Sequence, residues 1–464
     1  MFSPVGIGRP VIVNPAIRRG SRNPWHRAAR RGDVRPHIGV DAAMDRFAGT
    51  GRRGTPNAMP SAGMNRRFQR AGGIASELWP RVLDLDERAL FAEARRRTRL
   101  EDFAEDETFH QALGRLISSY ETEAHLKLIG RVTARQRTIR LLMNRLSLVE
   151  DRARRPEIAG QEIRSPLFLT GLPRSGTTLL HALLAQDPES RAPLHWEAVL
   201  PSPPLDRDSR AAGPRITAVE RQLLWLRRLQ PGIWRIHRLG ARLPAECATI
   251  MSLCFASFEF QAIHDVPTYE AWLETRDLVC SYAWHRRFLQ HLQSRCPGAR
   301  WVLRAPAHLF ELAALFATYP DARVVFTHRD PAEASESLAR ITVVLRSAFS
   351  DAVDPVAVGH EVTERWATAM ERASRYRDTG VIPSGRFLDV RYVDLLRDPI
   401  GTVRRLYAHW QVPLTNIAAK RIRRFVQATA MDAQYPCGGS AAEFGLDAEW
   451  IQERYRWYRE RFAV

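Results

Sequence analysis

Residues 167–178 read LFLTGLPRSGTT, and the apolar stretch LLHALLAQ follows them. An apolar run, a polar loop bounded by glycines and a second apolar run predict a strand, a phosphate-binding loop and a helix. Loops that bind nucleoside triphosphates follow the pattern G-x-x-x-x-G-K-[ST]. Gly171 and Gly176 have this spacing and Thr178 supplies the hydroxyl, but Thr177 stands where the lysine is required. The loop therefore predicts an anion site of a different kind.

The side chains of this loop suit a ligand with one phosphate at this point and less charge beyond it. A strand–loop–helix turn directs backbone N–H groups and the positive end of a helix dipole at one point. Ser175, Thr177 and Thr178 can donate hydroxyl hydrogen bonds, and we expect Ser175 to cap a helix over 175–186. Arg174 adds a planar cation. The alternative is an ordinary glycine turn, which seldom needs these four polar side chains together.

Strands and helices alternate along much of the remaining chain. This order indicates a parallel sheet covered on both faces, so we expect an α/β, phosphate-loop-like three-layer fold. Helices are predicted over 308–319 and from Pro331 onward, and LDAEWIQERYRWYRERF (446–462) predicts an amphipathic helix. Strands are expected in SPLFLTG (165–171), RWVLRAP (300–306), DARVVFTHRDP (321–331) and GRFLDVRYVDL (385–395).

The periodicity also predicts how the chain is organised. Residues 73–160 form a helical lead-in, and the α/β domain occupies 161–464. Within that domain, residues 205–295 form a mostly helical insertion, rich in aromatic residues that favour a core or the wall of an apolar pocket. Residues 1–72 are basic, lack sustained periodicity and are expected to lack a fixed fold.

The net charge of +18 is concentrated in that N-terminal extension, which holds 14 arginines and three aspartates. A basic chain suggests nucleic acid, yet the segment carrying the charge has no binding fold. We favour a solvated tail or an upstream start over a nucleic-acid arm, and a tether to an anionic surface remains a third explanation. No nucleic-acid partner is therefore predicted.

Several other classes are disfavoured. The five cysteines form no C-x-x-C pair and are odd in number, which argues against a disulfide framework or zinc site and fits a reducing cytoplasm. No apolar run reaches the roughly 18 residues of a transmembrane helix, and no secretory signal is visible. We expect a cytoplasmic protein without a bound metal.

A second polar cluster, THRDPAEASES (327–337), follows the third expected strand. Arg329 ends that strand, and Ser337 lies eight residues later in the next helix. Because ligands of α/β proteins bind at the carboxyl edge of the sheet, this pair could form a second anion site there. A surface Arg–Asp pair that caps the helix is the alternative.

Together, PRSGTTLLHALLAQDP and VVFTHRDPAEASES resemble the sulfotransferases that use 3′-phosphoadenosine 5′-phosphosulfate (PAPS), and in particular their bacterial branch. The resemblance covers roughly residues 75–464 and includes LHWEAVLPSPP, LPAECATIM, LRAPAHLF, VRYVDLLRDP and EFGLD. It implies PAPS as the co-substrate and a sulfuryl group as the transferred unit. It also implies a site for the 5′-phosphosulfate (Arg174, Ser175, Gly176, Thr177 and Thr178), a site for the 3′-phosphate (Arg329 and Ser337), and Tyr392 near the nucleotide.

The resemblance also implies roles in catalysis. Glu197 lies at about the distance from the loop where the tyrosylprotein branch has its catalytic Glu, and is the predicted base; a helix-capping carboxylate is the alternative. His195 and His308 are competing candidates, since His is the usual base near neutral pH. Arg304, in LRAPAH, stands where relatives place a Lys that stabilises the leaving group. Arg can act as a fixed cation there but cannot donate a proton. Arg174 is predicted to take part in catalysis as well as in donor binding.

The acceptor is predicted to be a small molecule or lipid with a hydroxyl group, such as an alcohol or phenol, with a carbohydrate or peptide left open. The helical insertion over 205–295 is expected to lie on the acceptor side of the site. Two alternatives compete with sulfuryl transfer. A kinase using nucleoside triphosphates would need the missing loop lysine and a magnesium-binding motif. A nucleic-acid-binding protein would depend on the basic N-terminus, and its binding would fall steeply with salt.

Overall fold

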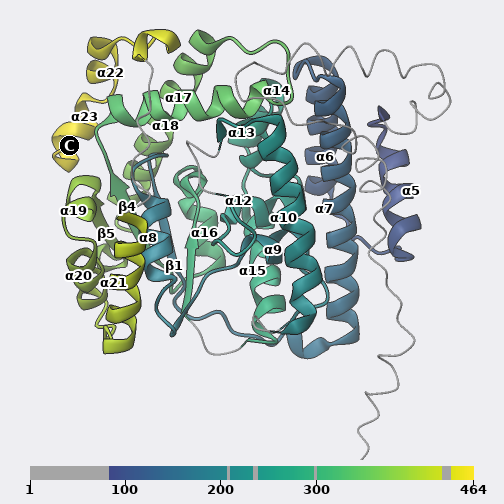
Figure 1. The fold of residues 1–464 in the computed structure, drawn as a ribbon, viewed down its shortest axis with the longest axis horizontal. Helices are drawn as coiled ribbons and strands as arrows, with labels where there is room; N and C mark the ends of the chain where they lie inside the picture. Colours follow the sequence, from purple (N-terminus) through teal and green to yellow (C-terminus); the bar gives the residue numbers. More distant parts are fainter. Residues whose placement is uncertain (1–82, 206–208, 234–238, 297–299, 431–439) are drawn as a thin grey trace, which may run out of the picture. The chain divides into compact units, whose positions relative to one another are not determined.

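The computed structural model describes residues 83–205, 209–233, 239–296, 300–430 and 440–464, which belong to the larger of two units of the chain, Arg70–Val464. A five-stranded sheet runs through it in the order β2-β3-β1-β4-β5, with every neighbouring pair parallel (Figure 1). The predicted α/β class with a parallel sheet is confirmed. The predicted extension over 1–72 lies outside the described residues. The strands are β1 (Leu167–Gly171), β2 (Ser190–Arg191), β3 (Arg300–Arg304), β4 (Arg323–His328) and β5 (Phe387–Arg391).

The central strand β1 is buried along its whole length, as expected for a parallel strand covered on both faces. Leu167 and Leu169 point to one face and Phe168 to the other, where they join separate apolar cores. The face of the sheet that carries Leu167 and Leu169 is covered by α8 (Thr177–Leu184), α20 (Pro399–His409) and α21 (Asn416–Ala430). The face that carries Phe168 is covered by helices that include α15 (Val279–Gln293) and α16 (Leu312–Thr318). Two helical layers around one sheet make the three-layer fold.

β4 and β5 each lead closely into a helix. β4 leads to α17 (Pro331–Ser347), whose first turn is capped by the Asp330 carboxylate, and α18 (Pro355–Asp378) follows. β5 leads without a gap into α19 (Tyr392–Arg397). The predicted C-terminal helix is divided into α22 (Ala448–Arg454) and α23 (Arg456–Phe462), because Tyr455 leaves the helical path and buries its ring.

Helices also occupy the segments before β1 and between β2 and β3. The first contains α5 (Glu87–Thr98), α6 (Glu107–Thr122) and α7 (Leu128–Arg154). The second contains α9 (His195–Val199), α10 (Gly213–Leu229), α12 (Cys247–Met251), α13 (Glu259–Ile263), α14 (Pro267–Glu274) and α15. Aromatic side chains of this second segment, such as Tyr269, Trp272 and Trp284, are buried in the core. Within the described residues, no helix is both long and apolar enough to cross a membrane.

Candidate active site

The candidate site begins where β1 and β4 end side by side. Gly171 pairs with Thr327 in the parallel register, so the loops that follow the two strands leave the same edge of the sheet. Gly171 has a φ of 134°, and a Cβ atom on it would lie 2.2 Å from the Thr327 carbonyl oxygen. Only glycine permits this close approach, which brings the loop to the end of β4.

The loop turns through Arg174 and Gly176, whose φ values of 70° and 94° lie in the left-handed region. Ser175 does not cap the helix, contrary to the prediction, because Gly176 holds the N-cap position and α8 begins at Thr177. The fully buried Ser175 hydroxyl instead donates to the Leu172 carbonyl at 2.5 Å and contacts the Thr327 hydroxyl at 2.5 Å. Ser175 therefore fixes the shape of the loop.

The backbone of the loop offers unpaired donors. The N–H groups of Gly176, Thr177 and Thr178 donate no hydrogen bond to any described residue. The Ser175 N–H, in contrast, donates to the Leu172 carbonyl. N–H groups at the start of a helix are suited to an anion because their dipoles add to those of the helix. The Thr178 side chain is exposed beside them. The start of α8 thus has the donors expected of a phosphate or phosphosulfate site.

The second predicted cluster lies against this loop. The Arg174 Nε atom donates to the Ser337 hydroxyl at 2.9 Å, and the Arg329 Nη1 atom donates to the Arg174 carbonyl at 3.0 Å. The Arg329 guanidinium lies 4.6 Å from the centre of the Tyr392 ring. That ring also packs on Gly176, where an added Cβ atom would lie 2.7 Å from the Tyr392 Cδ2 atom. The structure therefore brings five residues predicted from separate parts of the sequence into contact.

Arg329 also forms an ion pair with Glu333, one helical turn later, at 2.9 Å. The Glu333 side chain is 62% exposed, so water screens this pair and the carboxylate is free to move aside. An incoming phosphate could then accept from Arg329 in its place. The pair resembles the Arg–carboxylate alternative considered from the sequence, except that the partner is Glu333 and Asp330 caps the helix.

Arg304, at the end of β3, has a cationic side chain that is only 6% exposed. Its Nη2 atom donates to a Glu246 carboxylate oxygen at 2.6 Å, and its buried Nε atom has no hydrogen-bond partner among the described residues. A buried donor left unpaired is costly, so it marks a place where an anionic oxygen would be stabilised. β3 neighbours β1, with Arg304 paired in register with Leu169. Arg304 thus lies on the strand next to the loop strand.

Glu246, the partner of Arg304, was not singled out from the sequence. It precedes α12, but its carboxylate does not cap that helix and instead turns to Arg304. Its side chain is 32% exposed, so it combines an ion pair with access to solvent. The stretch LPAECATIM gives no local sign of this contact, because Glu246 and Arg304 are 58 residues apart in the chain; only the tertiary fold shows the partner.

The predicted base Glu197 lies on α9 and is 1% exposed. One carboxylate oxygen accepts from Arg191 Nη2 at 3.1 Å, and the other accepts from the Leu194 N–H at 2.8 Å. This is the helix-capping geometry that the sequence left as the alternative. Both oxygens are used inside the fold, where they tie β2 to the helix that follows it.

The two predicted histidines lie apart from the loop contacts. His308 is fully buried, with Nδ1 2.6 Å from the Tyr282 hydroxyl and its ring against Phe168. Burial, together with the nearby His285, lowers the pKa of His308 well below its usual value, so it is neutral at pH 7. Burial also lowers the pKa of His195, on α9.

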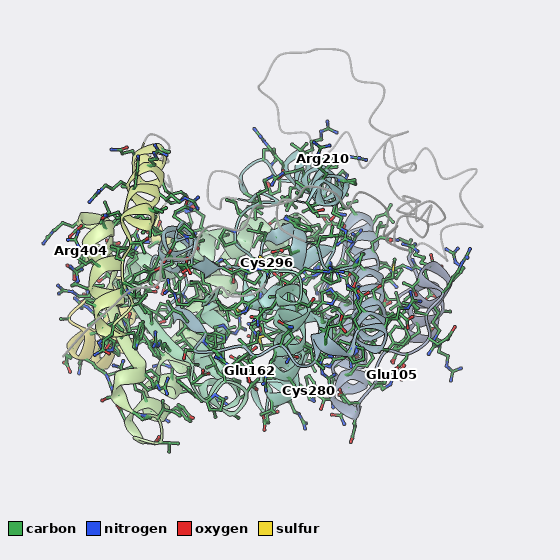
Figure 2. The ribbon with its side chains drawn as sticks, turned by 90° about the horizontal axis from the view of Figure 1, so that it is seen from below. Glu105, Glu162, Arg210, Cys280, Cys296 and Arg404 are labelled. Carbon is green, nitrogen blue, oxygen red and sulfur yellow. The ribbon has the colours of Figure 1, made fainter. Side chains whose placement is uncertain are left out.

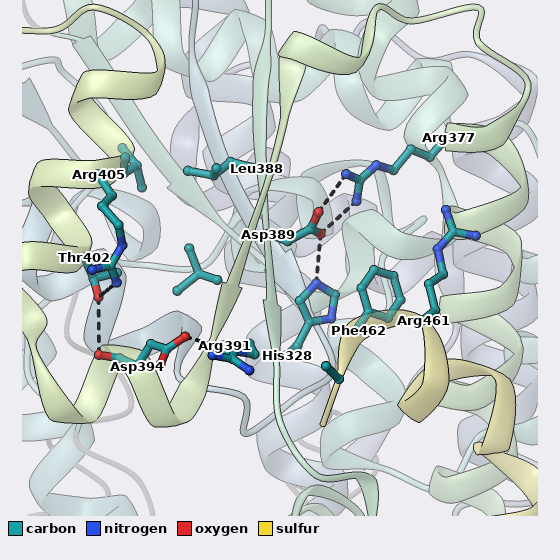
Figure 3. Close-up of a pocket in the computed structure, with 13 residues that line it drawn as sticks. His328, Arg377, Leu388, Asp389, Arg391, Asp394, Thr402, Arg405, Arg461 and Phe462 are labelled. Atoms are coloured by element: carbon teal, nitrogen blue, oxygen red, sulfur yellow. Dashed lines mark hydrogen bonds and ion pairs between the residues drawn. The ribbon is translucent and has the colours of Figure 1, made fainter.

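A cavity of about 540 Å³ lies beside β5 and is separate from these contacts (Figure 3). Its charged groups are largely paired with one another: Arg377 donates twice to Asp389, which also bonds His328, and Arg391 donates to Asp394. None of the predicted donor-binding residues lines it. We therefore place the candidate site at the loop rather than in this cavity.

The comparisons with known proteins agree with the geometry. A family model described as "Sulfotransferase family" matches residues 166–416, which include the loop, Arg304, Arg329 and Ser337. The chain is 26% identical over 273 residues to the omega-hydroxy-beta-dihydromenaquinone-9 sulfotransferase Stf3 of Mycobacterium bovis. That match covers 56% of this chain and 66% of the relative, just under two thirds of the relative's length.

Two solved structures share the fold over most of their length. Sulfotransferase STF1 from Mycobacterium tuberculosis H37Rv is 31% identical with a TM-score of 0.72, and the similarity covers 81% of this chain and 99% of that one. Sulfotransferase STF9 from Mycobacterium avium is 27% identical with a TM-score of 0.73, covering 82% and 97%. With its phosphate-type loop, its paired anion clusters and these matches, the chain belongs to the sulfotransferase family.

Proposed function

We propose that this protein transfers a sulfuryl group from PAPS to an acceptor hydroxyl. The observation that carries the proposal is the contact between the loop residue Arg174 and the second cluster, Ser337 and Arg329. Two anion sites linked in this way suit a nucleotide that carries both a 5′-phosphosulfate and a 3′-phosphate. Membership of the sulfotransferase family supports the same donor.

The donor-binding roles follow from the positions of the groups. The N–H groups of Gly176, Thr177 and Thr178, the Thr178 hydroxyl and Arg174 hold the 5′-phosphosulfate. Ser175 acts on the donor indirectly, through the loop conformation that it stabilises. Arg329 and Ser337 hold the 3′-phosphate. Tyr392, stacked between Arg329 and Gly176, is available to the nucleoside.

We assign the chemistry to Arg304 and Glu246. The acceptor oxygen attacks sulfur, its proton passes to the Glu246 carboxylate, and the bond from sulfur to the bridging oxygen of the donor breaks. The positive charge of the Arg304 guanidinium stabilises the negative charge that develops on the departing phosphate. Glu246 is preferred to Glu197 because its side chain is partly exposed and contacts Arg304. Both carboxylate oxygens of Glu197 already accept hydrogen bonds, one from Arg191 and one from the Leu194 N–H.

The acceptor class is inferred from the Stf3 relative, whose name gives a hydroxylated dihydromenaquinone as its acceptor. We propose an apolar or lipid alcohol for this chain too, bound on the side of the helical segment between β2 and β3. We also infer a reducing, cytoplasmic location, since Cys247, Cys254, Cys280 and Cys296 are free thiols.

A kinase remains the enzyme alternative to exclude. Transfer from labelled PAPS to host-cell metabolites, followed by mass spectrometry, should yield products heavier by one sulfuryl group, and should continue in EDTA. Calorimetry should show tighter binding of 3′-phosphoadenosine 5′-phosphate (PAP) than of AMP. Activity that vanishes in EDTA and returns with magnesium and ATP, or equal affinity for PAP and AMP, would contradict the proposal.

A further inference from the structure

A short part of the described chain carries most of its excess positive charge. Residues 1–72 account for +11 of the +18 net charge, which leaves +7 for residues 73–464. Residues 391–428 contain eight basic and two acidic residues, a net charge of +6. These 38 residues of 392 therefore hold nearly all of the remaining excess, and they form α19, α20 and α21.

The charge on α21 lies on one side of that helix. Ala418, Ala419 and Ile422 are buried, and α21 packs through this side on α8 and α20. Helical periodicity places the remaining cations on the outer side, and all of them are exposed. The helix contains no acidic residue. The outward cations of α21 are Lys420, Arg421, Arg423 and Arg424.

This outer side is not neutralised by the rest of the fold. Within residues 391–428, which the structure describes throughout, Arg404 and the four cations of α21 form no ion pair. The two acidic residues are engaged: Asp394 pairs with Arg391, and Asp398 caps α20. Figure 1 shows α19, α20 and α21 together at one end of the sheet, beyond β5, and Figure 2 shows Arg404 projecting outward there.

Apolar side chains are exposed on two of these three helices. Ile417, on the outer side of α21, is 62% exposed, and Val393 and Leu396 on α19 are 58% and 53% exposed. They are three of the four most exposed large apolar side chains of the described chain, the fourth being Val381 at 71%. The phosphates of a nucleic acid would pair with the cations, but they would not bury a projecting isoleucine or leucine. A bilayer with acidic head groups attracts the cations and also buries exposed apolar side chains in its interfacial layer.

We propose that the basic flank, defined as the exposed residues of α19, α20 and α21, docks the protein on the surface of an anionic lipid bilayer. The cations contact acidic head groups, while Ile417, Val393 and Leu396 enter the interfacial layer. The apolar side of α21 stays packed on α8 and α20, so the helix contributes its charged side without leaving the fold. This surface is independent of the proposed sulfuryl transfer, and either could fail without the other.

The test uses the full-length chain and flotation with two vesicle types, phosphatidylcholine alone and phosphatidylcholine mixed with phosphatidylglycerol. We expect binding only to the mixed vesicles, falling as salt rises. Replacing Lys420, Arg421, Arg423 and Arg424 by Gln should weaken that binding by about tenfold or more, since each cation near an anionic surface contributes roughly a fivefold effect. A control set of four exposed arginines replaced by Gln removes equal charge elsewhere: Arg96, Arg154, Arg164 and Arg375.

A second pair of variants tests the apolar contribution. Ile417→Ser should weaken vesicle binding by roughly two- to fivefold, whereas Val381→Ser, at a more exposed site outside the flank, should not. Thermal unfolding of every variant should match the wild type, because all of these side chains are exposed. Equal losses for the flank and control sets, no effect of Ile417→Ser, or tighter binding to duplex DNA than to mixed vesicles would overturn the proposal.

Discussion

The proposed donor side and the proposed acceptor side of the site differ in how far local sequence determines the positions of their residues. On the donor side, the loop of residues 171–178 and the segment from Arg329 to Ser337 follow directly from two short motifs, and the fold brings them together at the Arg174–Ser337 contact. On the acceptor side, the predicted base Glu197 faces Arg191 in the interior, and Glu246 takes the position beside Arg304.

This difference reflects the physics of the two sides. A strand, a tight turn and a helix N-terminus orient backbone N–H groups by local geometry alone, so a contiguous motif is enough to predict an anion site. The Arg304 partner of Glu246, by contrast, lies on a strand far away in the sequence, so this contact is set by tertiary packing. A carboxylate with the correct spacing along the chain can therefore point into the core, as Glu197 does.

The largest expected effect is on the acceptor side. Glu246→Gln keeps the shape of the side chain and its hydrogen bond to Arg304 but removes the proton acceptor, so kcat should fall by roughly 10²–10⁴-fold. Donor affinity, measured by calorimetry with PAP, should not fall. Glu259→Gln, in the same helical segment, is the matched control and should keep kcat within a few-fold. Near-normal turnover by Glu246→Gln would remove Glu246 from the chemistry.

Glu197→Gln should show the opposite pattern. It leaves the buried Arg191 guanidinium without its counter-charge, so the free energy of unfolding should fall by about 3–5 kcal/mol in denaturant titrations. The folded fraction should keep its kcat within a few-fold. A hundredfold loss of kcat at unchanged stability would return the base to Glu197 and would reverse the comparison between the two carboxylates.

Arg304→Ala should remove the cation at the leaving group. Loss of a single donor of this kind costs about 2.7–4 kcal/mol in the transition state, which is roughly 10²–10³-fold in kcat. Arg304→Lys should recover part of the loss, because a Lys keeps the charge. Arg300→Ala, at the other end of the same strand, is the control. Equal rates for Arg304→Ala and Arg300→Ala would show that Arg304 has no role in transfer.

The smallest expected effect tests the proposed donor side, at the residues assigned to the 3′-phosphate. Arg329→Ala should weaken PAP binding by about 1.5–3 kcal/mol, roughly 10- to 150-fold, while AMP binding stays constant because AMP lacks the 3′-phosphate. Ser337→Ala should act in the same direction. Arg391→Ala, at the end of the neighbouring strand β5, serves as the control. A parallel loss of PAP and AMP affinity in Arg329→Ala would mean that the residue supports the loop without contacting the 3′-phosphate.

The sequence was sufficient for the sheet, because β1, β3 and β4 are apolar runs with clear boundaries. It was insufficient for β2, which has two residues and carries no periodicity of its own. Ser175 shows why a local preference can fail: a serine before a helix normally caps it, but close packing of Gly171 on Thr327 makes an inward hydrogen bond available. Glu246 shows the converse, since its partner Arg304 lies 58 residues away in the chain.

The register between β1 and β4 has a consequence for selectivity. Because Gly171 lies opposite Thr327, the loop after β1 and the turn after β4 start from neighbouring strands, whose backbones in a sheet are about 4.8 Å apart, and the Arg174–Ser337 contact joins the two segments. In the proposed function, the sheet therefore fixes the distance between the groups that bind the 5′ and the 3′ charges of one nucleotide. Inserting a single residue into β1 or β4 would shift one of these groups by about 3.3 Å along its strand. We expect such a variant to lose its preference for PAP over AMP.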